Sequence, residues 1–128
     1  MVVRMVGDGN CYFRAVSYAV MGSQDHHEQV RNKVVEFMRA NTEKLKNYSG
    51  DEDYLNNSGM ETVDVWGTDV EICATAALLN TDIHVYCKTG YNYNWQAYPA
   101  KVMGSPSTYS CCIYLQNLVN IHYDYVAG

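Results

Sequence analysis

The stretch Gly7-Asp8-Gly9-Asn10-Cys11-Tyr12-Phe13-Arg14-Ala15 decides how the rest of the chain is interpreted. Two glycines, which allow backbone geometry closed to other residues, stand with an Asp and an Asn immediately before Cys11. Apolar residues then recur at helical spacing from Cys11 to Met21, and Gly22 predicts the end of that helix. A helix that begins at Cys11 directs the positive end of its dipole at the sulfur, which stabilises a thiolate and helps to assemble an oxyanion site. Cys11 is therefore a candidate nucleophile.

The composition is that of a globular protein. The 128 residues predict a single domain over 1–128, with 48% hydrophobic and 18% charged residues. The net charge of −5 disfavours nucleic acid and anionic membranes as partners. No apolar run has the length of a signal peptide or a membrane span. We expect a monomer that binds neither nucleic acid nor membranes.

The cysteines indicate a reducing environment. Their number, five, is odd, and no signal peptide accompanies them, so we expect free thiols in an intracellular compartment. The expected location is the cytoplasm, either of the protein's own cell or of a host cell. Because no two cysteines are separated by two residues, the spacing typical of structural zinc sites is missing. The sequence predicts no metal and no cofactor.

Helical patterns fill the first two-thirds of the chain. The predicted helices cover residues 11–21, about 25–41, 42–47 and 68–79. Asp25 with Glu28, and Thr68 with Glu71, match the capping-box pattern at two of the helix starts, and Ser23 is a second possible cap. Asn57-Ser58-Gly59 is typical of a loop.

Strand patterns follow in the last third. The predicted strands cover residues 83–87, 91–98, 109–115 and 119–126. A turn is expected at Thr89-Gly90, a loop over 101–108 and a second turn at Asn117-Leu118. The strand over 109–115 is apolar on both faces and is a candidate for the centre of the sheet. This order predicts an α+β fold, in which helices pack against a small, mostly antiparallel sheet.

The last predicted strand carries the candidate partners of Cys11. His122 and Asp124 are two residues apart, so their side chains project from the same face, about 6.5 Å apart at the backbone. Asp124 can then orient the imidazole and favour its protonated form. The other ring nitrogen can take a proton from Cys11, which is the logic of a nucleophile, a base and an orienting group.

Each of these patterns also has a purely structural interpretation. A cysteine after a Gly-rich turn occurs in structural settings, and a His-x-Asp pair on a strand is common on a solvated face. The residue patterns taken alone leave a thiol enzyme and a structural domain both open.

The segment Asp8–Ala15 resembles the nucleophile motif of the ovarian tumour (OTU) family of cysteine proteases. Further matches follow in the family's order and extend the resemblance over nearly the whole chain: Val30-Arg31, Trp66-Gly67, Glu71, Ile83-His84-Val85-Tyr86 and His122-Tyr123-Asp124. The resemblance implies a papain-like OTU fold. It also implies a thiol protease that removes ubiquitin or a ubiquitin-like modifier from conjugates, with ubiquitin or polyubiquitin as its partner.

Carried over by position, the resemblance implies that Cys11 is the nucleophile and His122 the general base. Asp124 occupies the position of the orienting group, while Asp8 belongs to the oxyanion loop and in some members lies on the side that helps the histidine. Oxyanion donors are expected among the backbone amides of the turn: Asp8, Gly9, Asn10 and Cys11. We expect Asn10 to brace this turn, and Arg14 and Trp66 to be structural.

The expected substrate also suggests contact residues. The ubiquitin tail carries arginines, which an acidic groove would attract, and the candidates are Asp51, Glu52 and Asp53; a solvated loop is the alternative. The glycines that end the tail need a narrow channel, for which Trp95 and Tyr123 are candidates. The remaining hypotheses are a protease for another modifier or a polyprotein, a catalytically silent ubiquitin-binding module and a structural domain. Only ten residues precede Cys11, so a minimal domain and a piece of a longer protein are both open.

Overall fold

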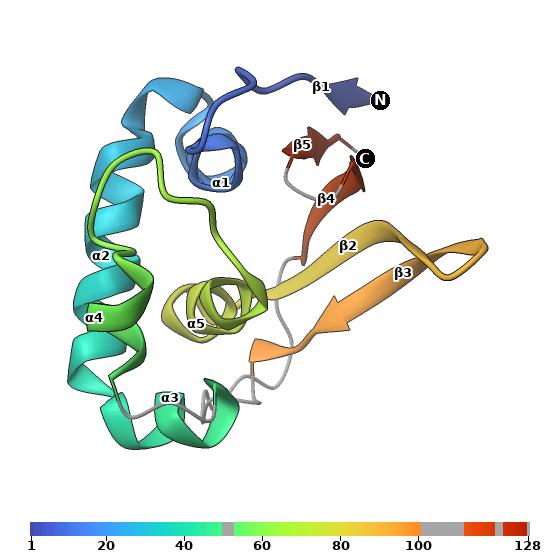
Figure 1. Ribbon diagram of the computed structural model, residues 1–128. Coiled ribbons are helices and arrows are strands. Elements are labelled where there is room, and N and C mark those ends of the chain that lie inside the picture. The colour runs from blue at the N-terminus through green and yellow to red at the C-terminus, as the bar shows by residue number, and fades with distance from the viewer. Residues whose placement is uncertain (50–52, 101–111, 120–121, 128) are drawn as a thin grey trace.

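The computed structural model describes residues 1–49, 53–100, 112–119 and 122–127 (Figure 1). Helices and strands follow in this order: β1 (Val2–Val3), α1 (Cys11–Met21), the 3₁₀ helix η1 (Gln24–His26), α2 (His27–Ala40), α3 (Thr42–Ser49), α4 (Tyr54–Ser58), α5 (Asp69–Leu79), β2 (Asp82–Thr89), β3 (Asn92–Tyr98), β4 (Cys112–Val119) and β5 (His122–Val126). The helices gather on one side of a five-stranded sheet. The predicted α+β fold is confirmed.

The sheet joins the two ends of the chain. Its strand order is β1-β5-β4-β2-β3, and β2 pairs with β4 in parallel while the other neighbours are antiparallel. The strand predicted to be central, β4, lies in the middle of this order. At one edge Val2 pairs with Val126, so the N-terminus and the C-terminus lie side by side (Figure 1). This pairing places β5 next to the residues that lead into α1.

The helix that carries Cys11 has the predicted bounds. It begins at Cys11 and ends at Gly22, whose φ of 75° is in the left-handed region and whose N–H donates to the carbonyl of Tyr18. The capping box predicted for α5 is also present, with Thr68 and Glu71 bonding to each other's backbone. The polar groups that the start of α5 leaves unpaired are satisfied by sequence-local side chains, which is why this start could be predicted.

Other local predictions need correction. The capping box of Asp25 and Glu28 does not form, because the Ser23 hydroxyl accepts from the Asp25 N–H at 3.1 Å and starts η1 instead, so that α2 begins at His27 without a side-chain cap. Asn57 and Ser58 belong to α4 rather than to a loop, and only Gly59, with a φ of 66°, ends that helix.

The turn predicted at Asn117-Leu118 is also wrong. Both residues continue β4, and Asn117 pairs with Cys87 of β2. Pairing with a neighbouring strand overrides the local turn preference of an Asn here. The predicted loop over 101–108 and the residues 109–111 of a predicted strand lie outside the described residues.

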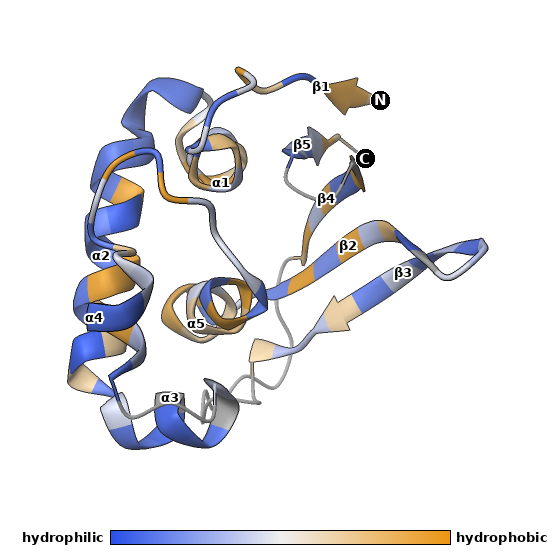
Figure 2. Cartoon of the chain, in the orientation of Figure 1, coloured by the Kyte–Doolittle hydropathy of each residue, from blue (hydrophilic) through white to orange (hydrophobic). Residues whose placement is uncertain are grey.

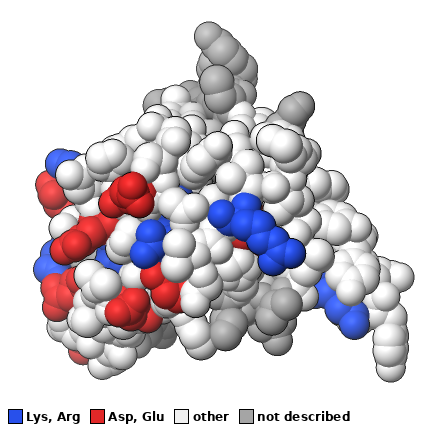
Figure 3. Space-filling view, turned by 90° about the horizontal axis from the view of Figure 1, so that it is seen from above, with Lys and Arg blue, Asp and Glu red and all other residues white. Residues whose placement is uncertain are grey.

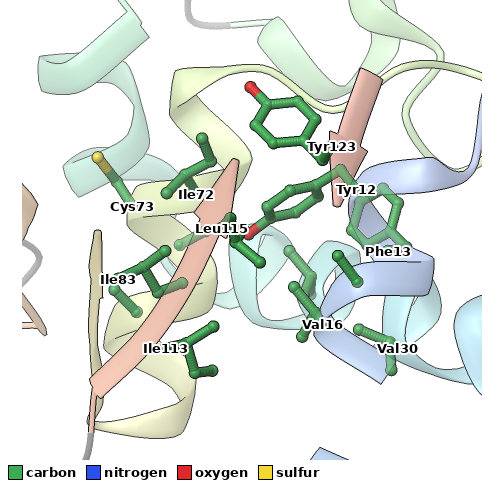
Figure 4. Packing of buried hydrophobic residues seen from close by; sticks show 14 of the residues in the cluster. Tyr12, Phe13, Val16, Val30, Ile72, Cys73, Ile83, Ile113, Leu115 and Tyr123 are labelled. Atoms are coloured by element: carbon green, nitrogen blue, oxygen red, sulfur yellow. The ribbon is translucent and has the colours of Figure 1, made fainter. Parts of the chain in front are cut away.

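The core lies between the sheet and helices α1, α2 and α5. Apolar residues line the inward sides of these elements, and α5 is apolar over much of its surface (Figure 2). The Tyr12 ring makes edge contacts to Phe13 and to Tyr123 of β5, with centroids 5.0 and 5.3 Å apart (Figure 4). Cys73 is buried in this core. No described helix has the length and hydropathy needed to cross a membrane.

Candidate active site

Cys11 and the last strand meet at the start of α1. The cysteine is only 2% exposed, and the backbone N–H of Tyr123 donates to its Sγ at 3.3 Å. Burial raises the pKa of the Cys11 thiol, and the negative charges of Asp8 and Asp124 raise it further, whereas the amides of Tyr123 and Tyr12 lower it. On balance, these surroundings raise the pKa of the Cys11 thiol above its usual value.

Asp124 forms a bond to His122 and a second bond to the start of the chain. The His122 Nε2 lies 2.8 Å from Asp124 Oδ1, as expected for residues on the same face of a strand. The same Oδ1 accepts from the backbone N–H of Met5, also at 2.8 Å. Asp124 is 5% exposed. The carboxylate is thus fixed from two directions, and the strand geometry used to infer the pair is present.

Asp8 is occupied by other partners. Its carboxylate accepts from Arg14 Nη2 at 2.8 Å and from Arg14 Nε at 3.1 and 3.2 Å, and from the Asn10 backbone N–H at 3.0 Å. The guanidinium of Arg14 holds the pKa of Asp8 at about 2, against the opposing effect of burial. Asp8 and Arg14 therefore brace the turn together, whereas His122 contacts Asp124.

The Asn10 side chain uses its full hydrogen-bonding capacity. Its Oδ1 accepts from the Asp64 backbone N–H at 2.7 Å and from Arg31 Nη2 at 3.0 Å, and its Nδ2 donates to Asp64 Oδ1 at 2.8 Å and to Asp8 Oδ2 at 3.3 Å. Asn10 is 3% exposed. It braces the turn, as expected, and does not face a substrate.

Sequence reasoning missed Asp64, which holds the turn from the segment before α5. A Cβ on Gly9 would lie 1.8 Å from the Asp64 carbonyl oxygen, so only glycine fits there. Asp64 itself has a φ of 74°, which is rare for a residue with a side chain. No pattern around Asp64 indicates this role, because the contact joins residues 54 positions apart.

Three of the four predicted oxyanion donors already have partners, and the first of them, the Asp8 N–H, donates to the Val6 carbonyl at 3.0 Å. The Asn10 N–H points to the Asp8 carboxylate, and the Cys11 N–H donates to the Asp8 carbonyl at 3.3 Å. The Cys11 bond is long and can be exchanged for a stronger acceptor.

A pocket of about 370 Å³ adjoins the His122–Asp124 pair. Its lining residues come from β1 and the residue after it, β4 and β5: Val2, Arg4, Gln116, Leu118, His122 and Asp124. Charged side chains gather mainly on the helical side of the molecule, whereas the sheet side is largely uncharged (Figure 3).

The predicted substrate contacts that the structure describes do not gather at the Cys11 site. Tyr123 is 6% exposed and packs on Tyr12, so its side chain belongs to the core and cannot cover a channel (Figure 4). Trp95 is 50% exposed but lies on β3, three strands away from β5 in the sheet. Asp53 is exposed at the start of α4, and Asp51 and Glu52 lie outside the described residues. Trp66, expected to be structural, is 46% exposed.

A separate group of side chains could hold a metal ion. The ligand atoms of Asp82, His84 and Cys112 lie within 4.8 Å of one another on the neighbouring strands β2 and β4. Gln116, four residues after Cys112 on β4, pairs with Asp124. The possible metal-binding group therefore lies further along the sheet and shares no residue with the Cys11 site.

Comparison with known proteins places these residues in a family context. A family profile described as OTU-like cysteine protease matches residues 6–123. The chain is 33% identical over 85 residues to the OVARIAN TUMOR DOMAIN-containing deubiquitinating enzyme 6 of Arabidopsis thaliana, an alignment that covers 65% of the chain and 16% of that protein. It is 35% identical over 81 residues to the OTU domain-containing protein 4 of Homo sapiens, covering 62% of the chain and 7% of that protein. The chain spans less than a fifth of the length of either relative.

Solved structures show the same architecture. The OTU domain of OTUD1 superimposes with a TM-score of 0.83 at 24% identity, covering 99% of this chain and 85% of that one. The Hazara virus OTU bound to ubiquitin gives a TM-score of 0.70 at 20% identity, covering 100% of this chain and 82% of that one. At these identities the likeness is one of fold.

Proposed function

The chain belongs to the family of OTU-like cysteine proteases, and from this membership we propose that it is a deubiquitinase. It hydrolyses the isopeptide bond at the C-terminus of ubiquitin, with Cys11 as nucleophile, His122 as general base and Asp124 as the group that orients the imidazole. One observation carries the proposal. On β5, the Asp124 carboxylate bonds to His122, and the N–H of Tyr123, the residue between these two, donates to the Cys11 sulfur.

The proposed reaction begins with a proton transfer. Asp124 binds Nε2 of His122, so Nδ1 is the nitrogen that takes the thiol proton of Cys11 as the sulfur attacks the carbonyl carbon of the terminal glycine. Burial raises the pKa of the thiol, so we assign the proton transfer to the same step as the attack. As negative charge develops on the carbonyl oxygen, the Cys11 N–H donates a hydrogen bond to it, in exchange for its long bond to the Asp8 carbonyl.

The remaining steps restore the enzyme. The tetrahedral intermediate collapses, the C–N bond breaks, and the imidazolium gives its proton to the departing lysine amine. Water then attacks the thioester while His122 takes one of its protons, and the thiol of Cys11 is regenerated with release of the free ubiquitin carboxylate. We also propose a reducing compartment, in which the Cys11 thiol that this chemistry needs stays reduced.

The test uses ubiquitin with a C-terminal electrophile. Wild type is expected to form a covalent adduct, and Cys11→Ala is expected to form none. Cys112→Ser is the matched control, because Cys112 is an exposed thiol on the sheet away from the site. An adduct that persists in Cys11→Ala, or one lost in Cys112→Ser, would contradict the proposal. Reaction with another modifier in place of ubiquitin would redirect the substrate and retain the chemistry.

A further inference from the structure

We propose that Arg31 is a positioning residue for the oxyanion turn before Cys11 and that it acts through Asn10 and the Gly9 carbonyl. The inference rests on the proposed function, because it assigns to Arg31 a part in the same reaction. Arg31 belongs to the Val30-Arg31 pair that matches the family motif, but the match alone gives it no role.

The burial of Arg31 is the first observation. The residue projects from α2 and is 0% exposed, and burial lowers its pKa although nearby carboxylates favour the charged form. Removing a guanidinium from water costs several kcal/mol, and an apolar side chain of similar size would fill the same space without that cost. A buried charge at this position therefore needs an explanation in the contacts that it makes.

Those contacts join two segments of the chain. Arg31 Nη1 donates to the carbonyl of Met60 at 3.0 Å, and Nη2 donates to Asn10 Oδ1 at 3.0 Å and to the Gly9 carbonyl at 3.4 Å. The guanidinium also lies over the Phe13 ring, 4.3 Å from its centroid. Two of the three oxygen acceptors belong to the turn, so the guanidinium fixes the turn against the Met60 segment.

The bond to Gly9 sets the direction of the next amide. In a trans peptide the C=O and the N–H point in opposite directions. Arg31 draws the Gly9 carbonyl inward, so the Asn10 N–H of the same peptide points away from Arg31, toward the Asp8 carboxylate at 3.0 Å. The bonds of Asn10 Oδ1 to Arg31 and Asp64 then fix the residue immediately before Cys11. The Cys11 N–H, the proposed oxyanion donor, inherits its orientation from this arrangement.

Only the fork of an arginine can make these contacts together. The two Nη atoms reach acceptors on different segments, whereas a lysine offers one ammonium nitrogen. Arg31→Lys keeps the positive charge and loses the bridge. Removal of an oxyanion donor lowers kcat by about 100- to 1,000-fold. Because the Cys11 N–H is displaced and not removed, we expect kcat to fall by about 10- to 100-fold.

The experiment separates positioning from folding. Arg31→Lys is compared with Arg39→Lys, which changes an exposed arginine of the same helix that pairs with Glu61. Asn10→Ser, which shortens the other half of the contact, is the second test variant. Each protein is assayed for kcat and KM with a fluorogenic amide of ubiquitin. Each is also assayed for the rate of Cys11 alkylation by iodoacetamide as a function of pH. Alkylation proceeds by displacement at carbon and develops no oxyanion, so it reports on the thiol alone.

We expect Arg31→Lys and Asn10→Ser to lower kcat by 10- to 100-fold, with KM and the alkylation rate within about threefold of wild type. Arg39→Lys should match wild type in all three. Parallel losses of kcat and alkylation in the Arg31 variant, or an unchanged kcat, would overturn the proposal. If wild type does not cleave the ubiquitin substrate, the proposed function fails separately. The positioning role is then decided by amide hydrogen exchange at residues 9–11, which must accelerate in Arg31→Lys and not in Arg39→Lys.

Discussion

Replacement of Asp124 tests the central contact of the candidate site. Its Oδ1 accepts from both His122 Nε2 and the Met5 N–H, each at 2.8 Å. Asp124→Ala removes both bonds, whereas Asp124→Asn keeps a carbonyl oxygen that can accept from both donors and loses only the negative charge. The pair of variants therefore distinguishes the charge of the carboxylate from its geometry.

The magnitudes follow from the strength of these bonds. A charge-assisted hydrogen bond contributes about 2–3 kcal/mol, and its loss as the imidazolium forms corresponds to about a 100-fold lower kcat in Asp124→Ala. A neutral acceptor retains about half of that energy, so Asp124→Asn should lose about tenfold. The alanine variant also leaves the buried Met5 N–H without its acceptor, which costs about 1–3 kcal/mol of the free energy of unfolding.

The assays are kcat with a fluorogenic ubiquitin amide and urea unfolding monitored by circular dichroism. Asp8→Ala is the comparison in the same assays, because its carboxylate pairs with Arg14. We expect it to lower kcat less than Asp124→Ala does. The reasoning is refuted if Asp8→Ala is the slower enzyme, or if Asp124→Ala stays within threefold of wild type while remaining folded.

Two further predictions concern the turn. Gly9→Ala places a Cβ 1.8 Å from the Asp64 carbonyl oxygen, so we expect a loss of about 2–3 kcal/mol in the free energy of unfolding. Gly7→Ala is the control and should be neutral, because no atom lies within 4 Å of the added Cβ. Equal urea midpoints for the two variants would contradict this packing. Folding lowers the pKa of Asp8 from 3.8 to about 2, which corresponds to at most about 2.5 kcal/mol and, after solvent screening of this partly exposed pair, to about 1 kcal/mol. This stability is present above pH 3.8 and lost as the pH falls through 2. In urea titrations, the free energy of unfolding of wild type should therefore exceed that of Asp8→Asn at pH 7 and equal it below pH 2. A difference in this free energy that is constant with pH would argue against the ion pair.

Predictions from sequence succeeded where the cause is local. The bounds of α1, the capping box of α5 and the shared face of His122 and Asp124 depend on residues within a few positions of one another. The failures at Asn117-Leu118 and at the start of α2 are of a different kind. There, strand pairing in one case and a competing cap at Ser23 in the other outweighed the local pattern.

The site itself shows the same division. The side chain of Tyr123 was a candidate for the substrate channel, yet alternation along the strand sends it to the face opposite His122, where it packs on Tyr12. Asp64 and Arg31 could not be assigned from sequence, because their contacts with Asn10 join positions 54 and 21 residues apart.

The contacts around β5 explain why the nucleophile and its partners can lie at opposite ends of the chain. Alternation on this strand sends His122 and Asp124 to one face and the Tyr123 ring to the other, where it anchors the strand on α1 through Tyr12. The Tyr123 N–H reaches the Cys11 sulfur, so the same anchoring contact sets the distance between strand and nucleophile. Met5 in turn bonds to Asp124. The segment before the turn, the turn and the last strand thus constrain one another. A change in any one of them should alter the position of the Cys11 sulfur.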